Sequence, residues 1–451
     1  MMAVVVSMAI AAVVGFVIVL ALDPGARGSR LVALSFPIGL AACALVLGGL
    51  SALGLAWTRF VVFAAVGALF LVAAATATAR RRGVEAAVAR DQTPRSIVAW
   101  AGGVVVAGML AGHALFVTLA PPGEWDFWAI WGLKAKVFHA AGGIDWEWLE
   151  RPANEFAHPD YPVLLPLAYD YLAVTIGRFP EKEIGLLFTA LAGSILLFAA
   201  SHLREATGSP MLATAGAVAL VGPVLTLDTG LADLPLLVFG GIALLELRSA
   251  LIDRREQRVA IAAAALVLAV LTKNEGISLA VAAGIAILIV GGSGRWAMLR
   301  AVVPAGITVF AWIALRRAHG LGTDLFVGDA FARLASASPA EVLGTLARHP
   351  PDYPVFWLAT VIAIVAGGSR RLARERWLFL AIALQLGFFL GAYLVTPRDL
   401  EWHVATSWPR LLSQLVVPMG FVAVMFAGEG LGSAIGLNRR SGDPPRKETE
   451  G

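Results

Sequence analysis

The chain has 451 residues, of which 59% are hydrophobic and 15% charged, and its formal net charge at neutral pH is +4. A mean hydropathy of +0.79 excludes an ordinary soluble domain, and repeated apolar runs near the length that crosses about 30 Å of hydrocarbon indicate a polytopic helical membrane protein. The single cysteine, Cys43, lies within such a run, which excludes a disulfide framework and a cysteine metal site.

Apolar runs in chain order predict an all-α protein with about 13 transmembrane helices. The first run starts at the N-terminus without a positive region or a clear cleavage site, so we expect a retained helix rather than a signal peptide. The runs cover residues 3–22, 31–53, 59–78, 97–119, 184–201, 211–227, 235–251, 259–271, 277–290, 299–315, 354–368, 377–395 and 411–429.

Clusters of basic residues between these runs set the predicted orientation. Lysine and arginine accumulate in cytoplasmic loops, so we expect every cluster inside, the N-terminus outside and the C-terminus cytoplasmic. The clusters are Arg80, Arg81, Arg82, Arg90 and Arg95; Arg254, Arg255 and Arg258; Arg370, Arg371, Arg374 and Arg376; and Arg439, Arg440, Arg446 and Lys447.

Two segments decide whether this orientation holds. A single helix over 259–290 would be roughly 48 Å long and would carry Lys273 and Glu275 near the bilayer centre, so we predict two short helices joined by "TKNEG", with the tip outside. The segment 161–177, with two prolines and three tyrosines, is predicted as a helix in the outer interface.

Chemically distinctive residues collect in the segments predicted to lie outside. Five of the seven histidines are there, whereas the cytoplasmic loops are short, rich in arginine and chemically plain. We therefore expect any functional site to face outward, and we expect residues 1–96 to be an accessory bundle and linker without a site. The external segments are 120–183, 228–234, 272–276, 316–353 and 396–410.

The stretch "EWDFWAIWGLKAKVFH" (124–139) follows the fourth run and predicts an amphipathic interfacial helix. One interpretation is an aromatic belt with lysines reaching toward the headgroups. The other makes Asp126, which has aromatic neighbours on both sides, a general base. The predicted apolar stripe is Trp128, Trp131, Ala135 and Phe138, and Asp126, Lys134 and Lys136 are expected off it.

Three further motifs carry charge at predicted external positions. "GLADLP" places Asp233 at the entrance of a span, or in a turn before a proline. "LTKNEG" places a cation and an anion at a membrane hairpin tip, which is either functional or a structural pair. "TPRDLEWHVATSWPR" supplies cations that phosphate ligands would explain, as would chance. The residues are Asp233, Lys273, Glu275, Arg398, His403 and Arg410.

Common cofactor motifs are missing from the sequence. It has no Walker A motif, no HExxH motif and no Rossmann glycine pattern in a usable context, and the external histidines lack metal-ligand spacing. We predict no cofactor and no metal, with a divalent ion as the alternative, and no nucleic-acid partner.

The pattern resembles the C-type glycosyltransferase (GT-C) superfamily of integral membrane enzymes, which includes protein mannosyltransferases and the aminoarabinose transferase of lipid A. Asp126 in "EWDFW" matches the acid of the first external loop, "HPDYPVLLPLAYDYL" the proline-rich lead into a membrane-lying helix, "GLADLP" the second acidic motif and "LTKNEG" the hairpin tip. The resemblance covers roughly 97–315. The chain departs from it in separating Glu124 from Asp126 and in carrying His158 and Asp160 instead of a lysine.

The resemblance implies a glycosyltransferase in a bacterial inner membrane with its site facing the periplasm. The donor would be a polyprenyl-phosphate sugar, the acceptor a hydroxyl of a lipid, glycan or protein, and the transfer inverting. Asp126 would be the base. Glu124, His158, Asp160, Asp233 and Glu275 would bind substrate together with His403 and the cations Lys134, Lys273, Arg316, Arg398 and Arg410.

The same features leave two alternatives open. A transporter or flippase of a lipid-linked sugar would share the basic external contacts and should show inverted repeats with broken helices. A membrane subunit without chemistry would use Asp126 only as a cap. For the glycosyltransferase we expect a catalytic core at 97–315, an external loop with C-terminal spans at 316–435 and a cytoplasmic tail at 436–451.

Overall fold

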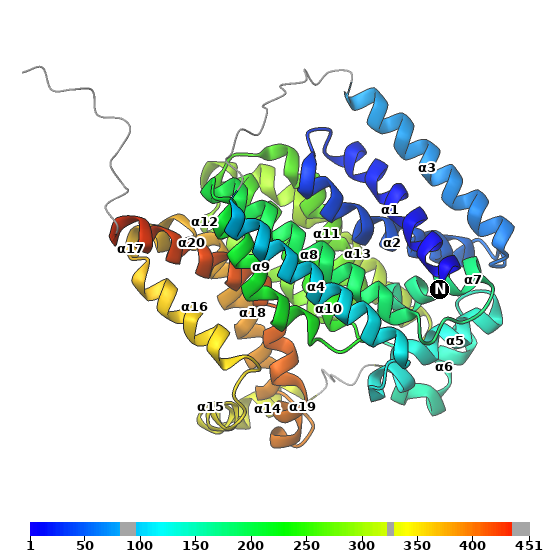
Figure 1. Ribbon diagram of the computed structural model, residues 1–451. Coiled ribbons are helices and arrows are strands. Elements are labelled where there is room, and N and C mark those ends of the chain that lie inside the picture. Colours follow the sequence, from blue (N-terminus) through cyan, green and yellow to red (C-terminus); the bar gives the residue numbers. More distant parts are fainter. Residues whose placement is uncertain (82–95, 323–328, 435–451) are drawn as a thin grey trace, which may run out of the picture.

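The computed structural model describes residues 1–81, 96–322 and 329–434 (Figure 1). All secondary structure in these ranges is helical, which confirms the predicted all-α class. The predicted tail at 436–451 and the basic residues Arg82, Arg90 and Arg95 lie outside the described residues.

Eight of the described helices are long and apolar enough to cross a membrane, which confirms a multi-span membrane protein. Each coincides with a predicted apolar run. They are α1 (Met2–Leu22), α2 (Gly28–Ala52), α3 (Arg59–Arg81), α4 (Ile97–Leu119), α8 (Ile184–Thr207), α10 (Asp233–Ile252), α13 (Arg295–Ala318) and α18 (Arg376–Leu394).

A bent pair of helices near the C-terminus supplies a ninth candidate span. α19 (Leu400–Ser413) and α20 (Val416–Ala434) meet at an angle of 52°. The structure therefore supports eight or nine spans in the described residues rather than 13. The remaining apolar runs also form helices, but these have 13–16 residues and reach about 20–24 Å each. They are α9 (Pro210–Leu225), α11 (Val259–Thr272), α12 (Glu275–Val290) and α16 (Pro354–Ala366).

The predicted external segments contain further short helices. The prediction of a loop over 396–410 is wrong, because Asp399 caps α19 by accepting the Trp402 backbone N–H at 2.8 Å. The helix predicted over 161–177 is α7 (Leu164–Ile176). The others in these segments are η1, a π-helix (Phe127–Trp131), α5 (Gly132–Ala141), α6 (Trp146–Glu150), η2 (Pro152–Ala157), α14 (Ala330–Ser336) and α15 (Pro339–Arg348). Three short elements lie outside the predicted external segments, namely η3 (Glu256–Arg258), η4 (Gly292–Gly294) and α17 (Ser369–Arg374).

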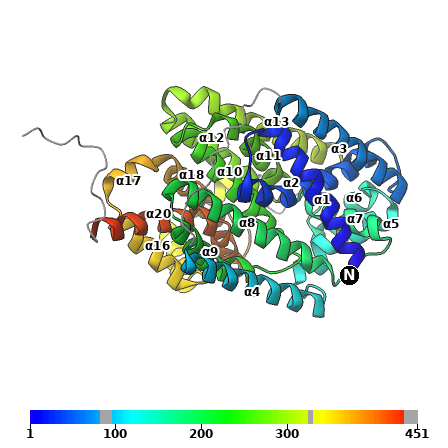
Figure 2. The same cartoon turned by 45° about the horizontal axis from the view of Figure 1, so that its top comes forward.

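The core of the bundle forms around α10. Every residue from Asp233 to Ala250 is buried, because α10 packs against α8, α11, α12, α13, α18, α19 and α20. By contrast, α3 and α4 lie at the periphery (Figures 1 and 2) and bury few residues, as expected of helices that face lipid.

The first two helices are joined to each other and to the core by specific contacts. α1 and α2 cross at Gly15 and Gly39, where a Cβ on either residue would collide with a backbone carbonyl of the other helix. Arg30 on α2 donates from Nε to Glu246 Oε1 on α10 at 2.7 Å, and both side chains are buried. α2 is therefore anchored to α10 by a buried ion pair.

The five predicted external segments contact one another at one end of the bundle. Glu150 bonds His319 at 2.6 Å, Glu401 bonds His349 at 2.7 Å, and α5, α6, α14, α15 and α19 lie at this end in Figure 1. The basic residues of the loop after α10 and those of α17 lie at the opposite end, where Asp253 is 3.5 Å from Arg374. The two groups therefore lie at opposite ends of the bundle, and which end faces the cytoplasm stays a prediction.

Candidate functional site

The candidate site is built around Asp233, the first residue of α10. Its side chain is 3% exposed and accepts from Lys273 Nζ at 3.1 Å on Oδ1. Its other oxygen accepts from Arg410, from Nη2 at 2.7 Å and from Nε at 3.1 Å. A carboxylate this deeply buried requires such partners. Asp233 is therefore the negative centre between two cations.

Arg410 links Asp233 to the predicted base, Asp126. Its Nη2 lies 2.9 Å from Asp126 Oδ2, and both side chains are partly exposed, at 29% and 27%. Asp126 is the N-cap residue of η1 and has helical backbone angles, and Arg410 lies in the last turn of α19. The carboxylate of Asp126 is therefore paired with a guanidinium rather than enclosed by the aromatic rings that flank it in the sequence.

Lys273 lies at the break between α11 and α12, which confirms the prediction of two short helices joined at "TKNEG". The close return of the chain depends on Gly276, because a Cβ there would collide with the Ala269 carbonyl. Lys273 also lies 2.8 Å from Glu275 Oε1. One cation thus joins both acids, Asp233 and Glu275.

Asn274 extends this cluster to the "HPDYP" motif, a connection that the sequence did not indicate. Its Nδ2 donates to Asp160 Oδ2 at 3.1 Å, and Trp312 of α13 donates from its indole N–H to the Asp160 carbonyl at 3.2 Å. Asp160 is only 2% exposed. The motif is therefore fixed against the hairpin tip by an amide and an indole, which carry no charge that sequence patterns would single out.

Lys134 is buried, contrary to the prediction that it lies off the apolar stripe. It shares one helical face with Trp131 and Phe138, three and four residues away, and is fully buried. Its Nζ donates to the carbonyl of His158 and lies 5.6 Å from the centre of the Trp131 ring. Burial lowers the pKa of Lys134 to about 7, opposed by the attraction of Asp160.

His158 supports Lys134 through its backbone rather than through its ring. The residue has a left-handed φ of 49°, which exposes its carbonyl to Lys134, and its ring stacks on Tyr161 at 4.8 Å between centroids. Trp128, which was predicted to share the apolar stripe with Trp131, is 41% exposed, and Lys136 lies over its ring at 4.5 Å from the centroid.

The other predicted site residues lie at the margin of the cluster or apart from it. Glu124 is exposed, and it lies within electrostatic range of Asp228, a carboxylate before α10 that the sequence analysis missed. Arg316 is one turn beyond Trp312 on α13. Arg398 is exposed and stacks on Trp402 at 5.3 Å, and His403 bonds Thr396 at 2.8 Å. None of the three has a recorded contact with Asp233.

The cluster as a whole carries more negative than positive charge. Asp126, Asp233 and Glu275 face Lys273 and Arg410, so both cations are already paired with carboxylates. A small apolar cavity of about 20 Å³ lies next to the cluster, lined in part by Pro235 and Thr272.

Within the described residues, no group of three or more histidine, cysteine, aspartate and glutamate side chains is placed to hold a metal ion. The arrangement instead offers the partly exposed carboxylate of Asp126 with one cation, Arg410, in contact with it, and an indole and an amide that fix the neighbouring loop. Comparisons of the chain with protein-family models, with curated proteins and with solved structures found no match.

Proposed function

We propose that this protein is a membrane glycosyltransferase that moves a sugar from a polyprenyl-phosphate donor to an acceptor hydroxyl, with inversion. The observation that carries the proposal is the convergence of Asp126, Asp233, Lys273 and Arg410 in one cluster of charge contacts. Asp126, Asp233 and Lys273 come from three separate motifs that carry the resemblance to GT-C enzymes, and Arg410 comes from the segment 396–410.

Asp126 is the proposed general base because its carboxylate is partly exposed, at 27%. It takes the proton of the acceptor hydroxyl as that oxygen forms a bond to the anomeric carbon. The bond between this carbon and the phosphate oxygen breaks, and polyprenyl phosphate leaves with the bonding electrons. Asp233, at 3% exposed, is too deeply buried for this role and instead positions the two cations.

Arg410 is proposed to bind the leaving phosphate. In the cluster it holds Asp126 with one nitrogen, while Asp233 accepts from two of its nitrogens. A donor phosphate that replaces the Asp126 contact leaves Arg410 fixed by Asp233 and at the same time frees the base. Guanidinium groups suit such exchanges because they bind carboxylates and phosphates with the same geometry.

The test is sugar transfer by membranes that contain the full chain, with a panel of polyprenyl-phosphate sugars and acceptors. Asp126→Asn should lower transfer by about 10²–10⁴-fold, the contribution of a general base, at unchanged expression. Glu147→Gln is the matched control, because Glu147 is an 81% exposed acid of the nearby helix α6, and it should transfer at the wild-type rate. Wild-type turnover in Asp126→Asn would contradict the proposal.

A transporter of lipid-linked sugars is the second candidate, and one observation favours it. Transporters often place their sites at interrupted helices in both halves of the fold. Asp233 is held by Lys273 at the break between α11 and α12 and by Arg410 one turn before the 52° bend between α19 and α20. Proteoliposomes that flip a labelled polyprenyl-phosphate sugar, without transfer to any acceptor, would establish the transporter instead.

A further inference from the structure

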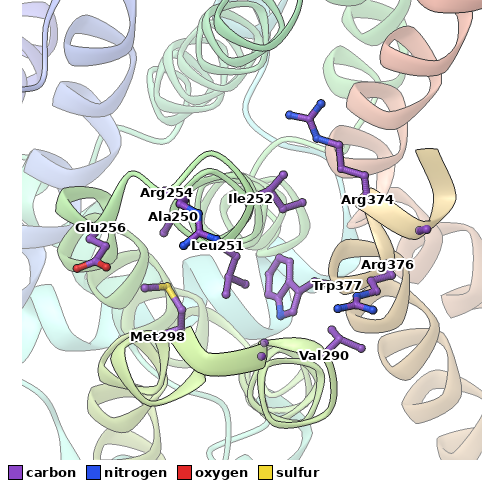
Figure 3. A pocket seen from close by; sticks show the side chains of 14 residues that line it. Ala250, Leu251, Ile252, Arg254, Glu256, Val290, Met298, Arg374, Arg376 and Trp377 are labelled. Carbon is purple, nitrogen blue, oxygen red and sulfur yellow. The ribbon is translucent and has the colours of Figure 1, made fainter. Parts of the chain in front are cut away.

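A cavity of about 350 Å³ opens at the end of the bundle opposite Asp233 (Figure 3). It is lined by the ends of α10 and α12, the glycine-rich turn at 291–294, and the starts of α13 and α18. Its volume is at the lower end of the range of small-ligand pockets, about 300–1,000 Å³. We call it the arginine pocket, after Arg254, Arg374 and Arg376.

The charged side chains that line the arginine pocket are predominantly cationic. Its three arginines face a single acid, Glu256. Arg374 is 3.5 Å from Asp253, whereas Arg254 and Arg376 have no ion-pair partner within the ranges that the structure describes. Arg254 also has a left-handed φ of 55°, an uncommon conformation for a residue with a long side chain. The pocket therefore attracts an anion.

Trp377 supplies a hydrogen-bond donor without an acceptor. The residue is 3% exposed, and its indole nitrogen is buried without a hydrogen-bond partner in the described part of the chain. An indole N–H only donates, and a buried donor left unpaired is costly. Figure 3 shows the Trp377 ring at the centre of the lining side chains, with Arg254 on one side and Arg376 on the other. An anionic oxygen would satisfy it.

The position of the pocket along the bundle indicates where this anion comes from. Ile252 ends the candidate span of α10, Met298 begins that of α13 and Arg376 begins that of α18, and all three line the pocket. Ends of spanning helices lie at the level of the lipid headgroups.

We propose that the arginine pocket binds the phosphate of an anionic phospholipid headgroup. Arg254 and Arg376 bind the phosphate oxygens as charged donors, and the Trp377 N–H donates to one of them. Basic pockets between membrane helices recognise anionic headgroups in this way. Because α10 has 20 residues and separates the pocket from Asp233 by about 30 Å, the proposal is independent of sugar transfer.

The test measures binding to the purified full chain in neutral detergent by native mass spectrometry. The probes are short-chain phosphatidylglycerol, phosphatidylcholine and inorganic phosphate. Phosphatidylglycerol should bind more tightly than both others. Arg254→Gln and Arg376→Gln should each weaken it about fivefold, and Trp377→Phe, which keeps an aromatic ring but lacks the donor, about tenfold.

Arg255→Gln is the matched control. It removes the same charge from the same loop, but Arg255 is paired with Glu205 at 2.8 Å and does not line the pocket. The Arg255→Gln variant should therefore bind phosphatidylglycerol with the affinity of the wild type. Equal weakening by Arg255→Gln would reduce the effect to net charge and overturn the proposal. Wild-type affinity in the double variant Arg254→Gln/Arg376→Gln would also overturn it. If inorganic phosphate bound as tightly as phosphatidylglycerol, the proposal that the bound phosphate belongs to a lipid would be overturned.

Discussion

Replacing Asp233 by asparagine should destabilise the protein more than any other neutralisation in the cluster. Asp233 is 3% exposed and accepts three charge-assisted hydrogen bonds, at 3.1, 2.7 and 3.1 Å. Asparagine keeps one acceptor oxygen and turns its amide N–H₂ toward a cation. Lys273 and Arg410 are then left facing each other without the carboxylate between them.

The magnitude follows from what the two cations retain. Breaking a buried ion pair by removing one partner costs about 3–5 kcal/mol. Lys273 keeps Glu275 at 2.8 Å and Arg410 keeps Asp126 at 2.9 Å, so we expect the lower end, about 3 kcal/mol. Glu275→Gln is the comparison, because Glu275 is 21% exposed and Lys273 keeps Asp233; we expect a loss of about 1 kcal/mol or less.

Thermal unfolding in detergent tests this order. Asp233→Asn should lower the midpoint by several degrees, clearly more than Glu275→Gln. The double variant Asp233→Asn/Arg410→Gln should lose less than the sum of the two single variants, because it also removes a cation that Asp233→Asn leaves uncompensated. The assignment of Asp233 as the buried centre would be refuted if Asp233→Asn melted at the same temperature as the wild type. It would also be refuted if Asp233→Asn lowered the midpoint no more than Glu275→Gln does.

Two further predictions concern buried titratable groups outside the spanning helices. Burial raises the pKa of Asp170 in the short helix α7 well above its ordinary value, so the folded chain keeps a proton that the unfolded chain releases above about pH 4. Asp170→Asn should therefore melt above the wild type at pH 7, with the gap closing toward pH 4; a variant that melts lower at pH 7 would contradict this. Burial lowers the pKa of Lys134 to about 7. Between about pH 7 and about pH 10.4 the Lys134 amine is therefore protonated only in the unfolded chain, so the stability of the fold should rise with pH over this range. Lys134→Met should lose this rise in pH-dependent melting, and an unchanged slope would count against the buried lysine.

The helices were predictable because each lies on a long apolar run, which hydropathy identifies directly. The number of spans was not, because α9, α11, α12 and α16 are as apolar as the long helices but too short to cross alone. Whether such helices cross, dip or pack inside depends on tertiary contacts. The loop predicted at 396–410 failed for a local reason, since Pro409 lies inside α19 and proline in a sequence favours a break.

Much of the candidate site was predictable from charge alone. Asp126, Asp233, Lys273 and Arg410 each stood out as ionisable residues next to apolar runs, and all four are in contact through Asp233 and Arg410. Asn274 was missed because an uncharged amide in a turn has no distinctive signal. Lys134 was predicted on the wrong face of its helix because Ala135 was assigned to the apolar stripe in its place. The spacing of three and four residues that relates Lys134 to Trp131 and Phe138 was not used.

The two cations that hold Asp233 come from interrupted helices, whereas Asp233 begins the most deeply buried helix of the bundle. Lys273 lies at the break before α12, and Arg410 lies one turn before the bend that leads into α20. α10 is packed on all sides from Asp233 to Ala250, so it cannot shift without disrupting the core. Chain interruptions are where helices change direction at low cost. Any rearrangement that opens the cluster to a phosphate must therefore move the α12 or α19 side against a fixed Asp233. Because Arg410 joins Asp233 to Asp126, a shift of the α19 side changes the contact between Arg410 and the proposed base.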